Sequence, residues 1–198
     1  QGGELVFEEY NEWFPQHRHP SWSIAKSMTH AMVGRLVAKG EIDPWDATDV
    51  PEWQDPDDPR SEITTDILLR MSSGLEWDES YTDPTGDVIT MLAGEASGDR
   101  AGYAAAKPID YEMDTVFEYS TGTTNILGRE IASRVGFGQE QIDWLQAELF
   151  DPLGIAPPEH HLDETGVISA GSEVDLRAED YARFGLLYLR GGEWDGEK

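Results

Sequence analysis

The spacing of hydrophobic residues along the chain predicts a protein built mainly from helices. After Trp22, apolar side chains recur at three- and four-residue steps up to Val37, and Gly40 provides a stop. This pattern predicts a helix that begins at Ser23. Further helices are predicted from similar spacing over residues 62–71, 87–94, 123–135, 139–149 and 178–190.

Extended segments are few by comparison. Residues 4–10 have the character of a short strand, and residues 115–120 are extended in character. Residues 43–59 are rich in Asp and Pro and are predicted to be mostly loop, while residues 98–115 show no clear pattern. These segments are too few to build a sheet. We therefore expect the chain to be part of a larger domain, with more strands before and after it.

Length and composition describe a chain that can fold. Its 198 residues have room for one domain with a sizeable core, and 38% of them are hydrophobic. No apolar run approaches the roughly 20 residues that a membrane-spanning helix needs. The sequence contains no Cys, which excludes disulfides, a Cys nucleophile and thiolate metal sites. The first residue is Gln, so the sequence does not decide whether a leader peptide was present or in which cellular compartment the protein works.

The charge balance narrows the range of partners. The formal net charge is −26, and a surface this acidic repels phosphate backbones, so no nucleic-acid partner is expected. Only four of the fourteen basic residues are Lys. Many acids with few lysines are typical of a protein kept soluble in high salt, as in halophiles. An ordinary solvated acidic surface explains the same composition.

One short motif carries candidate chemistry. Ser23 and Lys26 form a Ser-x-x-Lys sequence at the start of the predicted helix, and residues three apart lie on the same helix face. A Ser hydroxyl is a weak nucleophile until a base takes its proton. A buried Lys has a lowered pKa and can serve as that base. Such a motif also arises by chance, with a helix-capping Ser and a surface Lys.

The surrounding sequence decides between these interpretations. The helix that carries the motif resembles the nucleophile helix of class C β-lactamase and penicillin-binding-protein-like serine hydrolases, in which Ser-x-x-Lys is a catalytic signature. Further segments resemble the same superfamily in the same order: residues 68–84, 117–136, 150–155 and 163–192. Within it, the Asp-Glu-Ser-Tyr-Thr-Asp-Pro stretch and the Tyr-Ser-Thr element most resemble 6-aminohexanoate-dimer hydrolases, which cleave nylon oligomers.

The resemblance implies an α+β fold of the β-lactamase/transpeptidase type. In that fold, an antiparallel sheet flanked by helices stands beside an all-helical subdomain. Residues 1–198 would then be an incomplete catalytic domain that supplies mostly the helical part. Residues from about 28 to 160 would form the mainly helical subdomain, with Ser23 where the two parts meet.

The resemblance also implies roles for individual residues. Ser23 matches the acylated serine, and its backbone N–H would be half of the oxyanion hole. Lys26 matches the activating base, and Tyr119 matches the tyrosine that shuttles a proton. Thr121 stands where relatives carry Asn or Ser, and it is expected to contact substrate, as is Tyr81. Thr offers only a hydroxyl, which argues more against a β-lactamase than against an esterase. The third motif lies outside this sequence.

The expected function is hydrolysis of a small-molecule ester, amide or lactam through an acyl-enzyme on Ser23, without a cofactor. Three alternatives stay open: a class C β-lactamase, a cell-wall D,D-peptidase, and a catalytically inactive relative that binds a ligand. A Lys-Thr-Gly third motif would favour the peptidase. The oligomeric state is not predictable.

Metal chemistry is not expected. His17 and His19 lie in a predicted loop, and His160 and His161 lie near prolines, without further ligands at helical or hairpin spacing. The acidic stretch at 43–58 lacks the Gly and terminal Glu spacing of an EF-hand loop. We therefore interpret it as a solvated loop.

Overall fold

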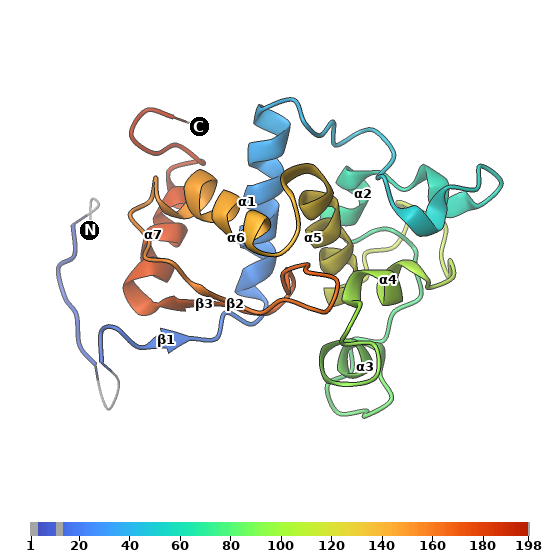
Figure 1. Cartoon of the computed structure of the whole chain (residues 1–198), viewed down its shortest axis with the longest axis horizontal. Helices are drawn as coiled ribbons and strands as arrows, with labels where there is room; N and C mark the ends of the chain where they lie inside the picture. The colour runs from blue at the N-terminus through green and yellow to red at the C-terminus, as the bar shows by residue number, and fades with distance from the viewer. Residues whose placement is uncertain (1–3, 11–13, 198) are drawn as a thin grey trace.

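The computed structural model describes residues 4–10 and 14–197, and two long helices lie at its centre (Figure 1). Helix α1 spans Ile24–Ala38, and helix α5 spans Thr121–Val135 and packs beside it. On the other side, α5 contacts α4 (Arg100–Ala105). The hydrophobic core extends along this row of helices.

Helix α1 forms because its apolar residues share one stripe. Ala25, Met28, Met32 and Leu36 have no exposed surface and recur at helical spacing. The residue before the helix, Ser23, has a helical backbone (φ −67°, ψ −5°), and its side chain makes no capping hydrogen bond. Its hydroxyl is therefore not used to satisfy the helix end.

Helix α5 is buried along almost its whole length. Ser120 caps it, because its hydroxyl accepts a hydrogen bond from the N–H of Thr123 at 3.0 Å. The helix ends at Gly136, whose φ of +102° suits a residue without a Cβ. The N-terminal turn of α5 is thus fixed in position, and Thr121 is its first residue.

A small antiparallel sheet lies at the N-terminal end of α1. Strand β3 (Val174–Arg177) is central, between β1 (Arg18–His19) and β2 (Glu159–His160). In register, Arg18 pairs with Arg177 and Glu159 pairs with Asp175. Strand β3 continues directly into helix α7 (Ala178–Leu189). The sheet therefore brings the chain just before α1 beside a segment more than 150 residues later.

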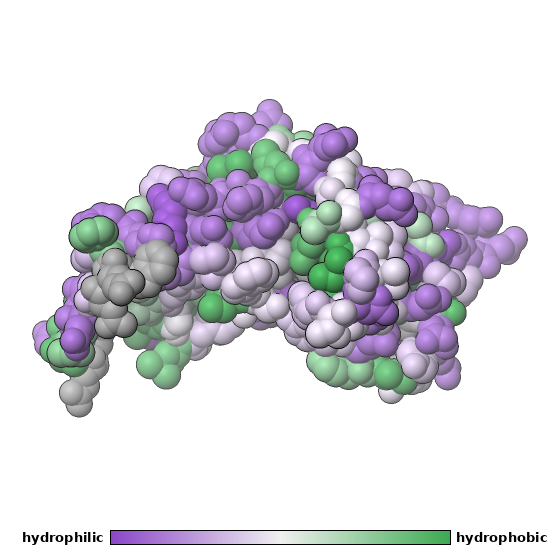
Figure 2. All heavy atoms as spheres, turned by 90° about the horizontal axis from the view of Figure 1, so that it is seen from below, coloured by the Kyte–Doolittle hydropathy of each residue, from purple (hydrophilic) through white to green (hydrophobic). Residues whose placement is uncertain are grey.

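The other elements are short. They are η1 (Pro51–Trp53), η2 (Pro59–Glu62), α2 (Thr65–Leu69), α3 (Asp87–Ala93), α6 (Gln139–Leu145) and the π-helix η3 (Gln146–Phe150). No helix in the described part of the chain is long and apolar enough to cross a membrane. Figure 2 shows one face that is mostly hydrophilic, with hydrophobic residues in small separate groups.

Several expectations from the sequence need correction. The strand predicted at 4–10 is wrong, because those residues form no strand. The helix predicted at 62–71 is reduced to α2 and follows the separate 3₁₀ turn η2. The helix predicted at 139–149 changes from α to π geometry at Gln146. Residues 98–115 contain α4, which was not predicted because alanines rather than larger apolar side chains fill most of its buried face.

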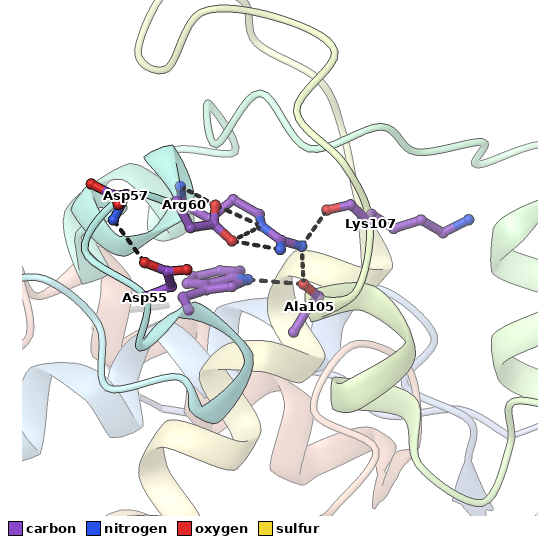
Figure 3. A network of polar contacts seen from close by, with 7 residues as sticks. Asp55, Asp57, Arg60, Ala105 and Lys107 are labelled. Carbon is purple, nitrogen blue, oxygen red and sulfur yellow. Dashed lines mark hydrogen bonds and ion pairs between the residues drawn. The ribbon is translucent and has the colours of Figure 1, made fainter.

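The Asp-rich segment is mostly loop, as predicted, and is anchored to α4 (Figure 3). The Arg60 guanidinium donates to the carbonyls of Ala105 at 3.1 Å and Lys107 at 3.0 Å. The indole N–H of Trp53 donates to the same Ala105 carbonyl at 2.8 Å. Arg60 also pairs with Asp58, and these contacts hold the pKa of the Asp58 carboxyl below its usual value. These residues thus supply hydrogen-bond donors to carbonyls at the C-terminal end of α4, which have no partner within the helix.

Replacing Arg60 with alanine is expected to lower the free energy of unfolding by about 1–3 kcal/mol, because carbonyls at the end of α4 lose a charged donor. Arg134→Ala is the matched control, since Arg134 is exposed, and it is expected to change stability by less than about 0.5 kcal/mol. Chemical denaturation of both variants measures the difference. Equal midpoints for the two variants would contradict the anchoring role.

Candidate active site

The Ser23 hydroxyl is exposed and lies close to one basic group. Ser23 Oγ is 3.2 Å from Lys26 Nζ, as expected for residues three apart on one helix face. The site's nucleophile candidate therefore combines access to solvent with a base in hydrogen-bond reach.

Lys26 reaches three oxygen atoms from three parts of the chain. Besides Ser23 Oγ, its Nζ donates to Thr121 Oγ1 at 3.0 Å and to the carbonyl of Gly171 at 2.8 Å. Burial lowers the pKa of Lys26 to about 8, while the negative charge of Glu79 opposes this shift. A substantial fraction of Lys26 is therefore neutral near physiological pH, which a general base requires.

The Gly171 carbonyl belongs to a segment that was not singled out as part of the site. The carbonyl of Ala170 accepts from the Thr29 hydroxyl at 2.8 Å, and that of Ser172 accepts from the Ser21 hydroxyl at 3.1 Å. Three consecutive carbonyls thus bind side chains from α1 and the residues just before it. Residues 169–172 are all small, which allows their backbone to lie close to α1, and this run is the sequence feature that could have indicated the contact.

Tyr119 contacts Lys26 through its ring. The Nζ of Lys26 lies 4.9 Å from the centre of the Tyr119 ring, a cation–π distance, and Tyr119 is 39% exposed. The structure thus brings together Ser23, Lys26 and Tyr119, which the sequence analysis assigned to catalysis. The proton-shuttle role of the Tyr119 hydroxyl stays a prediction.

Thr121 and Tyr81, which were expected to contact substrate, both bind Glu79. The Tyr81 hydroxyl donates to Glu79 Oε1 at 2.8 Å, and the Thr121 hydroxyl donates to the same oxygen. Partial burial and the Glu79 carboxylate raise the pKa of Tyr81 to about 12. Thr121 is fully buried, whereas Tyr81 is 55% exposed. Only Tyr81 therefore offers substantial surface to a substrate, and both substrate roles stay predictions.

Glu79 is, with Gly171, a site residue that sequence reasoning missed. Its Oε2 accepts from the Trp77 indole N–H at 2.5 Å and from the Thr121 backbone N–H at 2.8 Å. Trp77, Glu79 and Tyr81 occupy alternate positions, and the side chains of Trp77 and Tyr81 both bind Glu79. That alternation is the signal that could have identified Glu79.

Among residues 4–10 and 14–197, no group of three or more His, Asp or Glu side chains is placed to hold a metal ion. The amine of Lys26 contacts Ser23, and it is itself held by a hydroxyl and a backbone carbonyl, while a carboxylate holds that hydroxyl. A serine hydroxyl with an adjacent, positioned base is the arrangement that nucleophilic catalysis by serine requires.

Comparison with known proteins assigns the class. The Beta-lactamase family model matches residues 1–192, so the chain belongs to the β-lactamase family. Its fold is accordingly of the β-lactamase/transpeptidase type, and the helix-rich architecture with a small antiparallel sheet is consistent with the helical portion of that fold.

Within the family, the chain is similar to a 6-aminohexanoate-dimer hydrolase from Paenarthrobacter ureafaciens, with 29% identity over 97% of this chain and 51% of that protein. Its fold matches a structure from Bacillus anthracis assigned to the same type of hydrolase, with TM-score 0.81 and 21% identity, over 98% of this chain and 54% of that one. A penicillin-binding protein from Bacillus halodurans matches with TM-score 0.67 and 19% identity, over 90% of this chain and 62% of that one. The chain spans about half the length of the hydrolases that it matches.

Proposed function

We propose that the protein is a serine hydrolase that cleaves an ester or amide bond through an acyl-enzyme on Ser23. The observation that carries this proposal is the exposed Ser23 hydroxyl, 3.2 Å from a lysine whose pKa burial lowers to about 8. Two further acceptors, Thr121 and Gly171, fix the position of the Lys26 amine beside Ser23.

The proposed reaction begins when Lys26 takes the proton of the Ser23 hydroxyl. Ser23 Oγ forms a bond to the substrate carbonyl carbon, and the electron pair of the C=O bond moves to the oxygen. When that pair returns, the bond to the leaving alcohol or amine breaks, and the leaving group takes the proton that Lys26 had accepted, through Tyr119. Water then attacks the acyl-enzyme by the same route and releases the acid. The backbone N–H of Ser23, at the start of α1, is the proposed donor to the oxyanion.

The substrate class is proposed as a small ester or amide of the 6-aminohexanoate-dimer type. The support is the similarity to a hydrolase of that name and the stretch from Trp77 to Tyr81, which contacts Thr121 through Glu79. A β-lactamase or D,D-peptidase activity is the second candidate, favoured by the likeness of the fold to a penicillin-binding protein. We also propose that residues from about 28 to 160 form the helical subdomain of the catalytic domain.

The test is covalent labelling of the protein, at its full natural length, with a fluorophosphonate probe. Intact mass is measured for the wild type, for Ser23→Ala and for Ser27→Ala, the matched control one turn further along α1. We expect the wild type and Ser27→Ala to gain the mass of one probe and Ser23→Ala to gain none. An unlabelled wild type would reject the hydrolase and favour a ligand-binding relative. If the wild type is labelled, protein that has not been exposed to the probe is then screened with esters, amides and β-lactams.

A further inference from the structure

The carboxylate of Glu79 is surrounded by hydrogen-bond donors. Oε1 accepts from the hydroxyls of Tyr81 and Thr121, and Oε2 accepts from the Trp77 indole and the Thr121 backbone N–H. An ionised carboxylate has about four lone-pair sites and no donor. These four contacts use all of these sites. The carboxylate therefore accepts in each contact.

This arrangement fixes the direction of the Thr121 hydroxyl. Its single proton is directed to Glu79, so its oxygen can only accept from Lys26. The Gly171 carbonyl also can only accept. Two of the three contacts of Lys26 are thus restricted to N–H donation by their partners.

The third contact follows by counting hydrogens on nitrogen. A neutral amine has two N–H groups and one lone pair. Thr121 and Gly171 each require one N–H, so the lone pair of neutral Lys26 faces the remaining partner, Ser23 Oγ, at 3.2 Å. From the ammonium form, the proton that is lost is accordingly the one directed at Ser23. The base thus has the orientation needed to accept the Ser23 proton.

We propose that Glu79 is a positioning residue, which orients the Thr121 hydroxyl so that the lone pair of Lys26 is directed at Ser23. This inference rests on the proposed hydrolase function. Glu79 acts through Thr121 and Lys26 and forms no bond to the substrate. Without the carboxylate, the Thr121 hydroxyl is free to rotate and donate to the Lys26 lone pair, which would then be unavailable to Ser23.

The test is the pH dependence of acylation in Glu79→Gln, with the fluorophosphonate labelling rate as the measurement. Gln has nearly the same shape, but its amide nitrogen donates, so it cannot accept all four hydrogen bonds. We expect the maximal rate to fall roughly tenfold or more, since part of the general-base contribution is lost. We also expect the midpoint of the pH profile to move to lower pH, because the Glu79 charge raises the pKa of Lys26.

The direction of the pH shift separates positioning from structural damage. If Glu79 only held the fold together, its loss would let water reach Lys26 and would move the midpoint up toward the ordinary lysine pKa. Glu76→Gln is the matched control, with the same charge change in the same segment on an exposed residue, and should behave as wild type. An unchanged or raised midpoint in Glu79→Gln would overturn the proposal, as would an unchanged maximal rate.

A second pair of variants tests the relay with Glu79 in place. Thr121→Ser keeps the hydroxyl and should retain most of the labelling rate, whereas Thr121→Val keeps the shape, removes the hydroxyl and should lose roughly tenfold or more. Equal rates for Ser and Val would overturn the role of the hydroxyl even if Glu79→Gln fails to fold. A wild type that is not labelled at any pH would instead reject the proposed function, together with the inference that rests on it.

Discussion

Replacing Lys26 with methionine is expected to lower the acylation rate by about 10²–10⁴-fold, the usual contribution of a positioned general base. Methionine is flexible, apolar and of similar length, so it suits the partly buried position without leaving an unpaired charge. Lys26→Arg provides a stricter comparison. It keeps a positive charge beside Tyr119, but the guanidinium does not lose its proton in proteins. The acylation rate of this variant should therefore also fall.

The role of Lys26 as a base also predicts how the labelling rate changes with pH. Only neutral Lys26 can take the Ser23 proton, and burial lowers its pKa to about 8. The wild-type labelling rate should therefore rise as the pH increases through about 8 and then reach a plateau. Lys39→Met is the control, because Lys39 makes a partly exposed ion pair with Glu148 at 2.6 Å, and its profile should match the wild type. Wild-type-like labelling of Lys26→Met would remove Lys26 from the mechanism.

Replacing Gly171 with alanine is expected to damage both stability and reactivity. The added Cβ would lie 2.7 Å from Thr121 Cγ2 and 3.1 Å from the Thr121 carbonyl oxygen. Thr121 is β-branched and fixed in the first turn of α5, so the segment at 169–172 must move instead. We expect a loss of about 1–3 kcal/mol in the free energy of unfolding, as for other overpacked sites.

The same movement should weaken the base. The Gly171 carbonyl accepts from Lys26 at 2.8 Å, so its displacement removes one of the acceptors that orient the amine. Gly185→Ala is the control, because a Cβ there meets nothing within 4 Å. As an exposed helical position, it should gain up to about 1 kcal/mol. Denaturation midpoints and labelling rates measure both effects. A Gly171→Ala variant as stable and as reactive as the wild type would contradict the close approach.

The helices could be predicted from the sequence more accurately than the strands. Helices α1, α5 and α7 are long enough for the helical period to repeat several times, and their predicted bounds differ from the observed ones by no more than about two residues. Strands β1 and β2 have two residues each and β3 has four, which is too short for a period of two to be recognised. Pairing across the chain, rather than local preference, decides where these strands form.

In the candidate site too, contacts between residues close in the sequence could be predicted, whereas contacts between distant residues could not. The contact between Ser23 and Lys26 follows from their spacing on one helix. The approach of Tyr119 to Lys26 was implied only by the family resemblance. The acceptors Thr121 and Gly171 are 95 and 145 residues away from Lys26, and no local pattern connects them to it. Glu79 was overlooked because it is one acidic residue among 40 Asp and Glu, and only its alternation with Trp77 and Tyr81 distinguishes it.

The three acceptors of Lys26 connect the proposed reactivity of Ser23 to the folding of the chain. Ser23 directly precedes α1, Thr121 begins α5 and Gly171 lies in the segment at 169–172. These acceptors therefore come together only when α1, α5 and that segment are packed against one another. In an unfolded chain, Lys26 would be hydrated and almost fully protonated at neutral pH, and Ser23 would be an ordinary alcohol. If Ser23 is the nucleophile, we therefore expect the unfolded chain to react with the probe no faster than an ordinary serine. The rate at which Ser23 becomes reactive during refolding would report when these segments come together.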